Sequence, residues 1–193
     1  MQKKSRNENI WNMPNTLTLT RILLTFIILY FIFLDYSIIL IVILFSIGMF
    51  TDFLDGLIAR KFNQKTEFGR KFDMIADRFF MISVALAIII NLSLDKILQK
   101  PHFIQILMIM SREIIALPGL ILAFMTGKGI PQVRWVGKST TLMQAIVFPL
   151  IMLSVFYPFF EFSIYLVLIT SILGISSGIF YINDILKMEA EKK

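Results

Sequence analysis

Long, predominantly apolar stretches follow one another along this sequence and restrict what the chain can fold into. A helix needs about 20 mostly apolar residues to cross the hydrocarbon layer of a membrane. Six such stretches are present, at about 15–34, 36–60, 69–91, 101–125, 137–156 and 160–185. They predict an all-α integral membrane protein with six transmembrane helices in one bundle. Pro118 and Gly119 predict a kink in the fourth helix.

The composition excludes several other classes of protein. Apolar residues make up 57% and charged residues 17% of the chain, whereas a soluble domain has about 45–50% and about 25%. These values argue against a soluble globule, a disordered chain and a nucleic-acid partner. Cysteine is absent and only one histidine occurs, which excludes disulfides, thiolate catalysis and His-rich metal sites. We expect a single membrane domain, 1–193, with a polar head at 1–13 and a charged tail at 187–193.

Basic residues are distributed unequally between the two sides that six spans would define. Fourteen lie in the head, the loops near 61–71 and 127–138, and the tail, against two on the opposite side, Lys96 and Lys100. The positive-inside rule therefore places both termini in the cytoplasm, with the plasma membrane as the expected location. Three arginines lie within the spans, where that rule cannot explain them: Arg21, Arg78 and Arg112.

Four aspartates occur at or inside the ends of the second and third spans: Asp52, Asp55, Asp73 and Asp77. An ionised Asp near the centre of a membrane helix costs about 2.5–3.5 kcal/mol, so these charges need compensation. Residues three or four apart share a face of a helix, and the short connection makes the two helices antiparallel neighbours. The four carboxylates can thus converge at the cytoplasmic side.

Convergent carboxylates predict a metal site, because carboxylate oxygen is the ligand type for Mg²⁺, Mn²⁺ or Ca²⁺. Two divalent ions would cancel four negative charges, and such a site suits phosphoryl or phosphodiester chemistry. Gly56 and Gly69 lie beside these aspartates and allow either close helix packing or the approach of a phosphate. Arg60 is either a positive-inside anchor or a clamp for a phosphate.

These residues resemble the signature of the CDP-alcohol phosphatidyltransferase family, D-x-x-D-G-x-x-A-R-x(8)-G-x(3)-D-x(3)-D. All eight fixed positions match, and they are Asp52, Asp55, Gly56, Ala59, Arg60, Gly69, Asp73 and Asp77. The resemblance implies transfer of a phosphatidyl group from a CDP-linked lipid, commonly CDP-diacylglycerol, to a small polar alcohol, with release of CMP. It also implies a six-helix homodimer that depends on Mg²⁺ or Mn²⁺.

The same resemblance implies roles for individual residues. Asp77 would help to hold the metals and would also be the base that takes the proton of the attacking hydroxyl. The other metal ligands would be Asp52, Asp55 and Asp73. The CDP group would lie against Asp52, Gly56, Ala59, Arg60, Gly69 and Asp73, with the small residues making room for cytidine and Arg60 holding a phosphate.

Three further segments resemble the phosphatidylglycerophosphate synthase branch and the related cardiolipin synthases. They are 14–21 (P-N-x-L-T-x-x-R), 111–113 (S-R-E) and 137–144 (G-K-x-x-T-x-x-Q). The resemblance implies an acceptor-phosphate pocket made of Arg112, Arg134 and Lys138. Two positions depart from that branch: Thr140 replaces a lysine, and Met74 replaces the usual proline after the third aspartate.

Other acceptors and one other class of function stay open. The resemblance implies glycerol 3-phosphate as the acceptor, and phosphatidylglycerol, inositol or inositol phosphate are the alternatives. A non-catalytic cation carrier or channel would also explain intramembrane carboxylates, although not the Gly, Ala and Arg positions between them. Gly174 and Gly178 form a G-x-x-x-G pair, for which we expect close packing within the bundle rather than a dimer contact.

Overall fold

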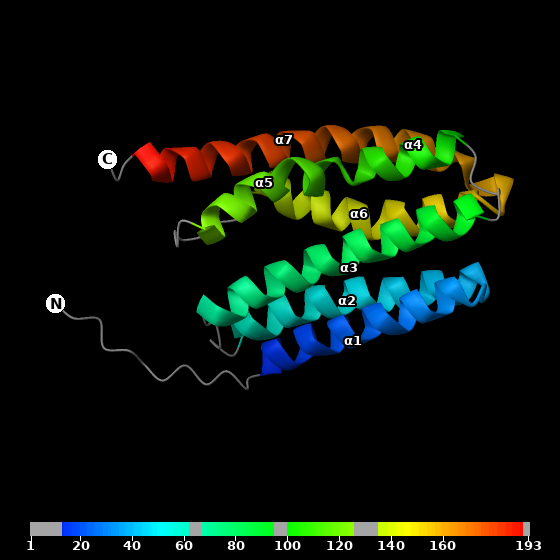
Figure 1. Cartoon of the computed structure of the whole chain (residues 1–193), viewed down its shortest axis with the longest axis horizontal. Coiled ribbons are helices and arrows are strands. Elements are labelled where there is room, and N and C mark those ends of the chain that lie inside the picture. The colour runs from blue at the N-terminus through cyan, green and yellow to red at the C-terminus, as the bar shows by residue number, and fades with distance from the viewer. Residues whose placement is uncertain (1–12, 62–66, 95–99, 126–134, 191–193) are drawn as a thin grey trace.

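Helices contain nearly all residues that the structure describes (Figure 1). The computed structural model describes the backbone of 13–61, 67–94, 100–125 and 135–190, with side chains left out at 13–14, 52–61, 67–68, 70, 122–125 and 188–190. The elements are α1 (Met13–Phe33), α2 (Ile38–Lys61), α3 (Glu67–Leu94), α4 (Lys100–Ile109), α5 (Ser111–Met125), α6 (Trp135–Ser154), the short 3₁₀ helix η1 (Pro158–Phe162) and α7 (Ser163–Ala190). The prediction of an all-α membrane protein is confirmed.

Four of these helical segments are long and apolar enough to cross a membrane: α1, α3, α6 and the stretch from η1 through α7. The bent pair of α4 and α5 makes a fifth candidate span. The apolar part of α2 with described side chains, Ile38–Thr51, is shorter than a full span. The described residues thus support four or five spans, and the predicted sixth remains a prediction.

The predicted kink at Pro118 and Gly119 is not where the fourth segment is broken. The break lies at Met110, where α4 and α5 meet at 42°, and Pro118 lies inside α5. At this break the Gln144 amide on α6 donates a hydrogen bond of 2.8 Å to the carbonyl oxygen of Ile109. A side chain that occupies a backbone acceptor can bend a helix, and this contact was not visible in the local sequence.

The last helix is longer than predicted. The predicted span ends near 185 and the charged tail begins at 187, but the helix α7 continues into that tail as far as Ala190. Neither glycine nor proline occurs between Ile185 and Ala190, so nothing in the local sequence stops the helix. Hydrophobicity marks where a span leaves the membrane, and it does not mark where its helix ends.

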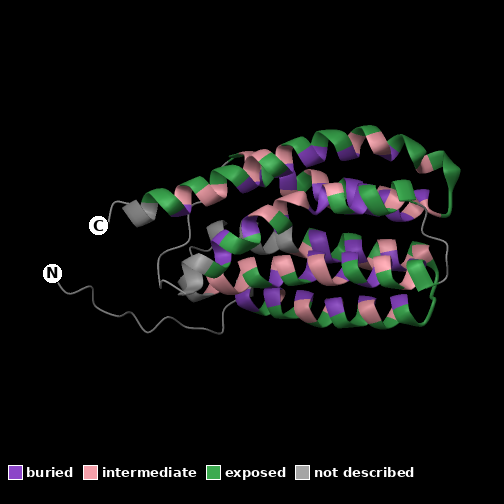
Figure 2. Ribbon diagram, turned by 45° about the horizontal axis from the view of Figure 1, so that its top comes forward, coloured by how far each residue is buried: buried purple, intermediate pink, exposed green. Residues whose placement is uncertain are grey.

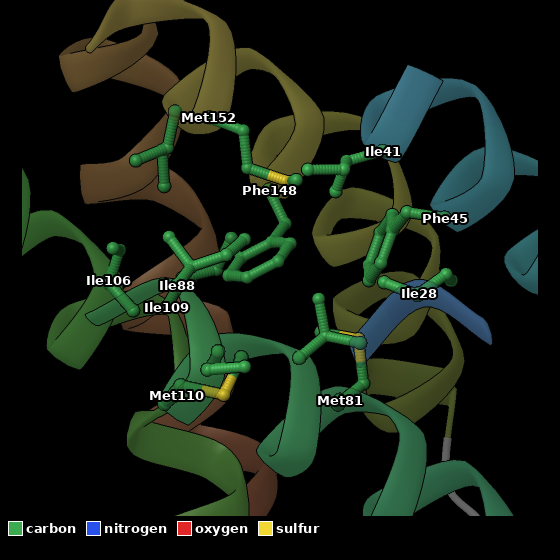
Figure 3. Packing of buried hydrophobic residues seen from close by; sticks show 14 of the residues in the cluster. Ile28, Ile41, Phe45, Met81, Ile88, Ile106, Ile109, Met110, Phe148 and Met152 are labelled. Carbon is green, nitrogen blue, oxygen red and sulfur yellow. The ribbon is translucent and has the colours of Figure 1, made fainter. Parts of the chain in front are cut away.

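Three aromatic rings join the first three helices to the rest of the bundle. The ring centroid of Phe45 on α2 lies 5.0 Å from that of Phe80 on α3 and 5.0 Å from that of Phe148 on α6. All three side chains are fully buried, and Figure 3 shows Phe45 and Phe148 among the core residues around them. Gly48 permits the close approach of α2 and α3, because a Cβ there would lie 2.6 Å from the Phe80 ring.

Glycines also bring α5 and α7 together. A Cβ on Gly178 would lie 2.8 Å from Cγ2 of Ile115, and one on Gly174 would lie 3.1 Å from Oγ of Ser111. From the α5 side, a Cβ on Gly119 would lie 3.0 Å from Cδ1 of Ile185. The expectation that the G-x-x-x-G pair packs within the bundle is confirmed.

Many large apolar residues are exposed on the outside of the bundle, and Figure 2 shows exposed positions along the described helices. On α1, Leu23 is 57%, Phe26 56% and Tyr30 63% exposed. Water would penalise an apolar surface this extensive, whereas lipid tails solvate it. This distribution of exposed apolar side chains is therefore typical of a helical bundle that lies in a lipid bilayer.

Candidate functional site

The predicted aspartates lie toward one end of the bundle, where α1 and α3 begin and α2 and α7 end (Figure 1). The backbone of α2 is helical through the predicted site positions to Lys61. The side chains of five of these positions lie outside the described residues, and they are Asp52, Asp55, Gly56, Ala59 and Arg60. Gly69 lies in the first turn of α3, one turn before Asp73.

Asp73 and Asp77 lie close together around one buried arginine. The guanidinium of Arg21 on α1 donates a hydrogen bond of 3.1 Å from Nη1 to Oδ1 of Asp73. The same Nη1 lies 4.0 Å from Oδ1 of Asp77. The Arg21 side chain is 0% exposed, against 42% for Asp73 and 26% for Asp77. A fully buried guanidinium needs such partners, because an unpaired buried charge is very costly.

The two described aspartates have the chemistry of a site for a hard divalent cation. Their carboxylates supply oxygen ligands from successive turns of one helix, and both face the same cation, Arg21. Among residues with described side chains, no group of three or more acidic, His or Cys residues is placed to hold a metal ion. The four-aspartate metal set therefore stays a prediction, because Asp52 and Asp55 would have to complete it.

A second cation lies next to Asp77 in the chain. The guanidinium carbon of Arg78 is 5.4 Å from the ring centroid of Tyr181 on α7, a cation–π contact between α3 and α7. Arg78 also interacts electrostatically with Asp77, Arg112 and Glu113. Within the described part of the chain, Arg78 Nη1, Asp77 Oδ1 and the Tyr181 hydroxyl are buried and have no hydrogen-bond partner. Buried polar atoms normally have a partner, so this group is suited to a polar ligand.

Arg112 is held by α6. Its Nη1 donates a hydrogen bond of 2.6 Å to Oγ1 of Thr141, and it lies 3.9 Å from Oε1 of Glu113. Lys138 lies one turn before Thr141 on α6 and is exposed, so it shares a helix face with the residue that holds Arg112. Of the predicted acceptor pocket, Arg112 thus contacts the face of α6 on which Lys138 lies one turn away. Arg134 lies outside the described residues.

Several residues of this region had no role in the sequence interpretation. Arg21 stood out as the last residue of the segment 14–21 and as an arginine inside a span, and Arg78 only as an arginine inside a span. Each has an acidic or aromatic partner in the structure. Glu113 and Gln144 belong to segments that resembled known motifs, which was the available signal. Nothing in the sequence pointed to Tyr181, because a tyrosine in an apolar helix is unremarkable without its neighbours.

The model of one protein family, CDP-alcohol phosphatidyltransferase, matches residues 11–176 of this chain. This match covers α1 to α6 and about half of α7, and it includes all eight signature positions.

Individual relatives match over shorter regions. A CDP-diacylglycerol–glycerol-3-phosphate 3-phosphatidyltransferase of Rickettsia typhi is 38% identical over 88 residues, which is 45% of this chain and 49% of the relative. An enzyme of the same name from Aquifex aeolicus is 46% identical over 70 residues, 36% of this chain and 38% of the relative. A CMP-forming cardiolipin synthase of Streptomyces coelicolor is 34% identical over 104 residues, 54% of this chain and 45% of the relative. The chain thus spans half or less of the length of these relatives.

Proposed function

This chain belongs to the CDP-alcohol phosphatidyltransferase family, and on that premise we propose that it transfers the phosphatidyl group of CDP-diacylglycerol to glycerol 3-phosphate. One observation carries the proposal. The last two acidic positions of the family signature, Asp73 and Asp77, meet around one buried cation at the end of the bundle where the other signature residues lie.

The cofactor of the proposed reaction is Mg²⁺ or Mn²⁺, with two ions at Asp52, Asp55, Asp73 and Asp77. These ions would supply Lewis-acid stabilisation of the diphosphate and of the departing CMP. The hard oxygen donors of Asp73 and Asp77 suit such ions. Gly56, Ala59 and Gly69 would leave room for cytidine, and Arg60 would hold a phosphate of the CDP group.

Asp77 would act as general base. Its carboxylate would take the proton of the acceptor hydroxyl, whose oxygen forms a bond to the phosphorus that carries the diacylglycerol. The bond from that phosphorus to the oxygen of the CMP phosphate breaks, and CMP leaves with the electron pair. Asp77 suits this role because its buried Oδ1 has no hydrogen-bond donor among the described residues, and 26% of the side chain remains exposed.

The acceptor phosphate would be held by the cations on the α5 and α6 side of Asp77. Arg112, held by Thr141, would provide a fixed guanidinium, and Lys138 and Arg134 would add charge. Arg78 interacts electrostatically with both Asp77 and Arg112, and Tyr181 interacts with Arg78 and Arg112. A phosphorylated acceptor is therefore favoured over free inositol, which has no anionic group for these cations.

The protein would work as a multi-pass homodimer in the plasma membrane, with both termini and the active site toward the cytoplasm. The excess of basic residues in the head, two loops and the tail supports this orientation. The beginning of α1 and the end of α7 lie at the same end of the bundle (Figure 1), as an even number of spans requires.

The proposal is tested by CMP release from purified protein in detergent, with CDP-diacylglycerol and Mg²⁺ or Mn²⁺. Glycerol 3-phosphate, phosphatidylglycerol, inositol and inositol phosphate are offered one at a time. We expect release with glycerol 3-phosphate, and loss of at least about 100-fold in Asp77→Asn. The matched control is Asp35→Asn, because Asp35 lies at the opposite end of α1 and its φ of 53° is one that Asn adopts readily.

Each other outcome has a distinct meaning. CMP release with phosphatidylglycerol or an inositol compound, and not with glycerol 3-phosphate, would show that the protein uses that other acceptor. Cation flux through liposomes without CMP release from any acceptor would contradict the transferase and favour an ion carrier.

A further inference from the structure

Arg21 is the most deeply buried charged side chain among those with described exposures, at 0%. It comes from α1, outside the family signature, and reaches α3 to contact Asp73 at 3.1 Å and Asp77 at 4.0 Å. Among the described side chains, the positive charge that lies against Asp73 and Asp77 therefore comes from outside that signature.

The charges of Arg21, Asp73 and Asp77 would each destabilise the fold if the opposite charge were removed. Two carboxylates one turn apart repel each other in a low-dielectric site, and a buried guanidinium without an anion is equally unfavourable. Nη1 of Arg21 lies close to an oxygen of each carboxylate. This placement reduces the repulsion between the carboxylates and also pairs the guanidinium with anions. The described group carries one positive and two negative charges, which is less repulsive than the carboxylates alone.

A divalent cation at the same carboxylates changes this balance. The ion would neutralise Asp73 and Asp77 more fully than Arg21 does, and the guanidinium would then face a second positive charge a few ångströms away. Coulomb repulsion between the two cations lowers metal affinity. Arg21 therefore has opposite effects on the metal-free and metal-bound forms.

We propose that Arg21 is a positioning residue that serves as a resident counter-cation. It holds Asp73 and Asp77 together when no metal is bound, and it opposes metal binding, so that the ions remain exchangeable. This inference rests on the metal site of the proposed function, but it concerns a residue of α1 that the signature does not contain.

The test measures Mn²⁺ binding to the full-length protein in lipid nanodiscs by electron paramagnetic resonance, without CDP-lipid. Arg21→Gln keeps a hydrogen-bond donor and removes the charge. We expect its dissociation constant for Mn²⁺ to fall about tenfold, because the repulsion is gone. Arg21→Lys keeps the charge, and its dissociation constant should stay close to that of the unaltered protein.

A matched control separates this effect from damage to α1. Thr25→Ala alters a residue one turn along the same helix, which is also 0% exposed and donates to the carbonyl oxygen of Arg21 at 2.9 Å. It carries no charge, so its affinity for Mn²⁺ should not change. Thermal unfolding gives a second readout: Arg21→Gln should lower the midpoint more in EDTA than in Mn²⁺, whereas Thr25→Ala should lower it equally in both.

Weaker or unchanged Mn²⁺ binding in Arg21→Gln would overturn the inference and leave the proposed function intact. Tighter binding in Arg21→Lys would also overturn it, because the effect would then not come from charge. Absence of Mn²⁺ binding by the unaltered protein, with Asp73→Asn as the reference, would overturn both the metal site and the inference.

Discussion

The side-chain amide of Gln144 on α6 donates a buried hydrogen bond of 2.8 Å to Oε2 of Glu113 on α5. The same amide donates to the carbonyl oxygen of Ile109, the last residue of α4, at 2.8 Å. One side chain thus connects three helices at the bend of the fourth segment. It also orients Glu113, the neighbour of Arg112.

Replacement of Gln144 by Leu should destabilise the fold. The change leaves two buried acceptors without their donor, and each costs about 1–3 kcal/mol. The midpoint of thermal unfolding in detergent should therefore fall by about 5 °C or more. Leu142→Ala is the control, because Leu142 lies on the same helix and is 60% exposed. Equal losses in both variants would show that Gln144 has no special role.

Gly178→Val tests the contact between α5 and α7. Even a Cβ would lie 2.8 Å from Ile115, so a branched side chain would push the helices apart. Overpacking of this kind costs about 1–3 kcal/mol and should lower the unfolding midpoint. The neighbouring variant Ile179→Ala removes an exposed side chain and should change it little. A fully stable Gly178→Val protein would contradict the close packing.

Thr141→Val tests whether the hydrogen bond to Arg112 orients the guanidinium for an acceptor. The variant keeps the shape of the side chain and removes the oxygen that accepts from Arg112 at 2.6 Å. A hydrogen bond to a charged group contributes about 1.5–3 kcal/mol, so the KM for glycerol 3-phosphate should rise about tenfold. The KM for CDP-diacylglycerol should be unchanged.

Thr140→Val is the matched control for that experiment. Thr140 is adjacent and buried, and among the described residues its hydroxyl bonds within its own helix, to the carbonyl oxygen of Val136. It should leave both KM values close to those of the unaltered protein. A similar rise of the KM for glycerol 3-phosphate in both variants would mean that valine disturbs α6 at either position. The proposed role of Arg112 in binding the acceptor would then lose its support.

Tyr181→Phe tests the unpaired hydroxyl on α7. The ring beneath Arg78 is retained and only the hydroxyl, which has no hydrogen-bond partner among the described residues, is removed. If that hydroxyl donates to the acceptor phosphate, kcat/KM for glycerol 3-phosphate should fall about tenfold. Tyr165→Phe, on the same helix and 70% exposed, should have no effect. An unchanged Tyr181→Phe enzyme would place the acceptor elsewhere.

The order of apolar and charged residues was enough to predict the helices and the shared position of Asp73 and Asp77, whereas the full set of four aspartates stays a prediction. A long apolar stretch predicts a helix in the membrane. Lipid offers no hydrogen-bond partners, so a span must satisfy its backbone hydrogen bonds within itself. The spacing of Asp73 and Asp77 predicts a shared face, because the helical repeat is a local property. Boundaries were less certain: the break at Met110 and the extension of α7 to Ala190 were both missed.

Tertiary structure decided which residues meet. The three arginines inside the spans were unexplained by charge distribution, and each has a partner on another helix: Arg21 with Asp73, Arg78 with Tyr181, and Arg112 with Thr141. Arg21 and Asp73 are 52 positions apart, so no local pattern relates them.

The physical reason is the difference between local and non-local interactions. Hydrophobic patterning and helical periodicity act within one segment, so the sequence by itself determined the class of fold and the metal-site candidates. The pairing of buried charges depends on which helix faces another, at which height and rotation. That arrangement depends on the close helix approaches at Gly48, Gly174 and Gly178 and on the ring contacts of Phe45. Only the packed bundle specifies it.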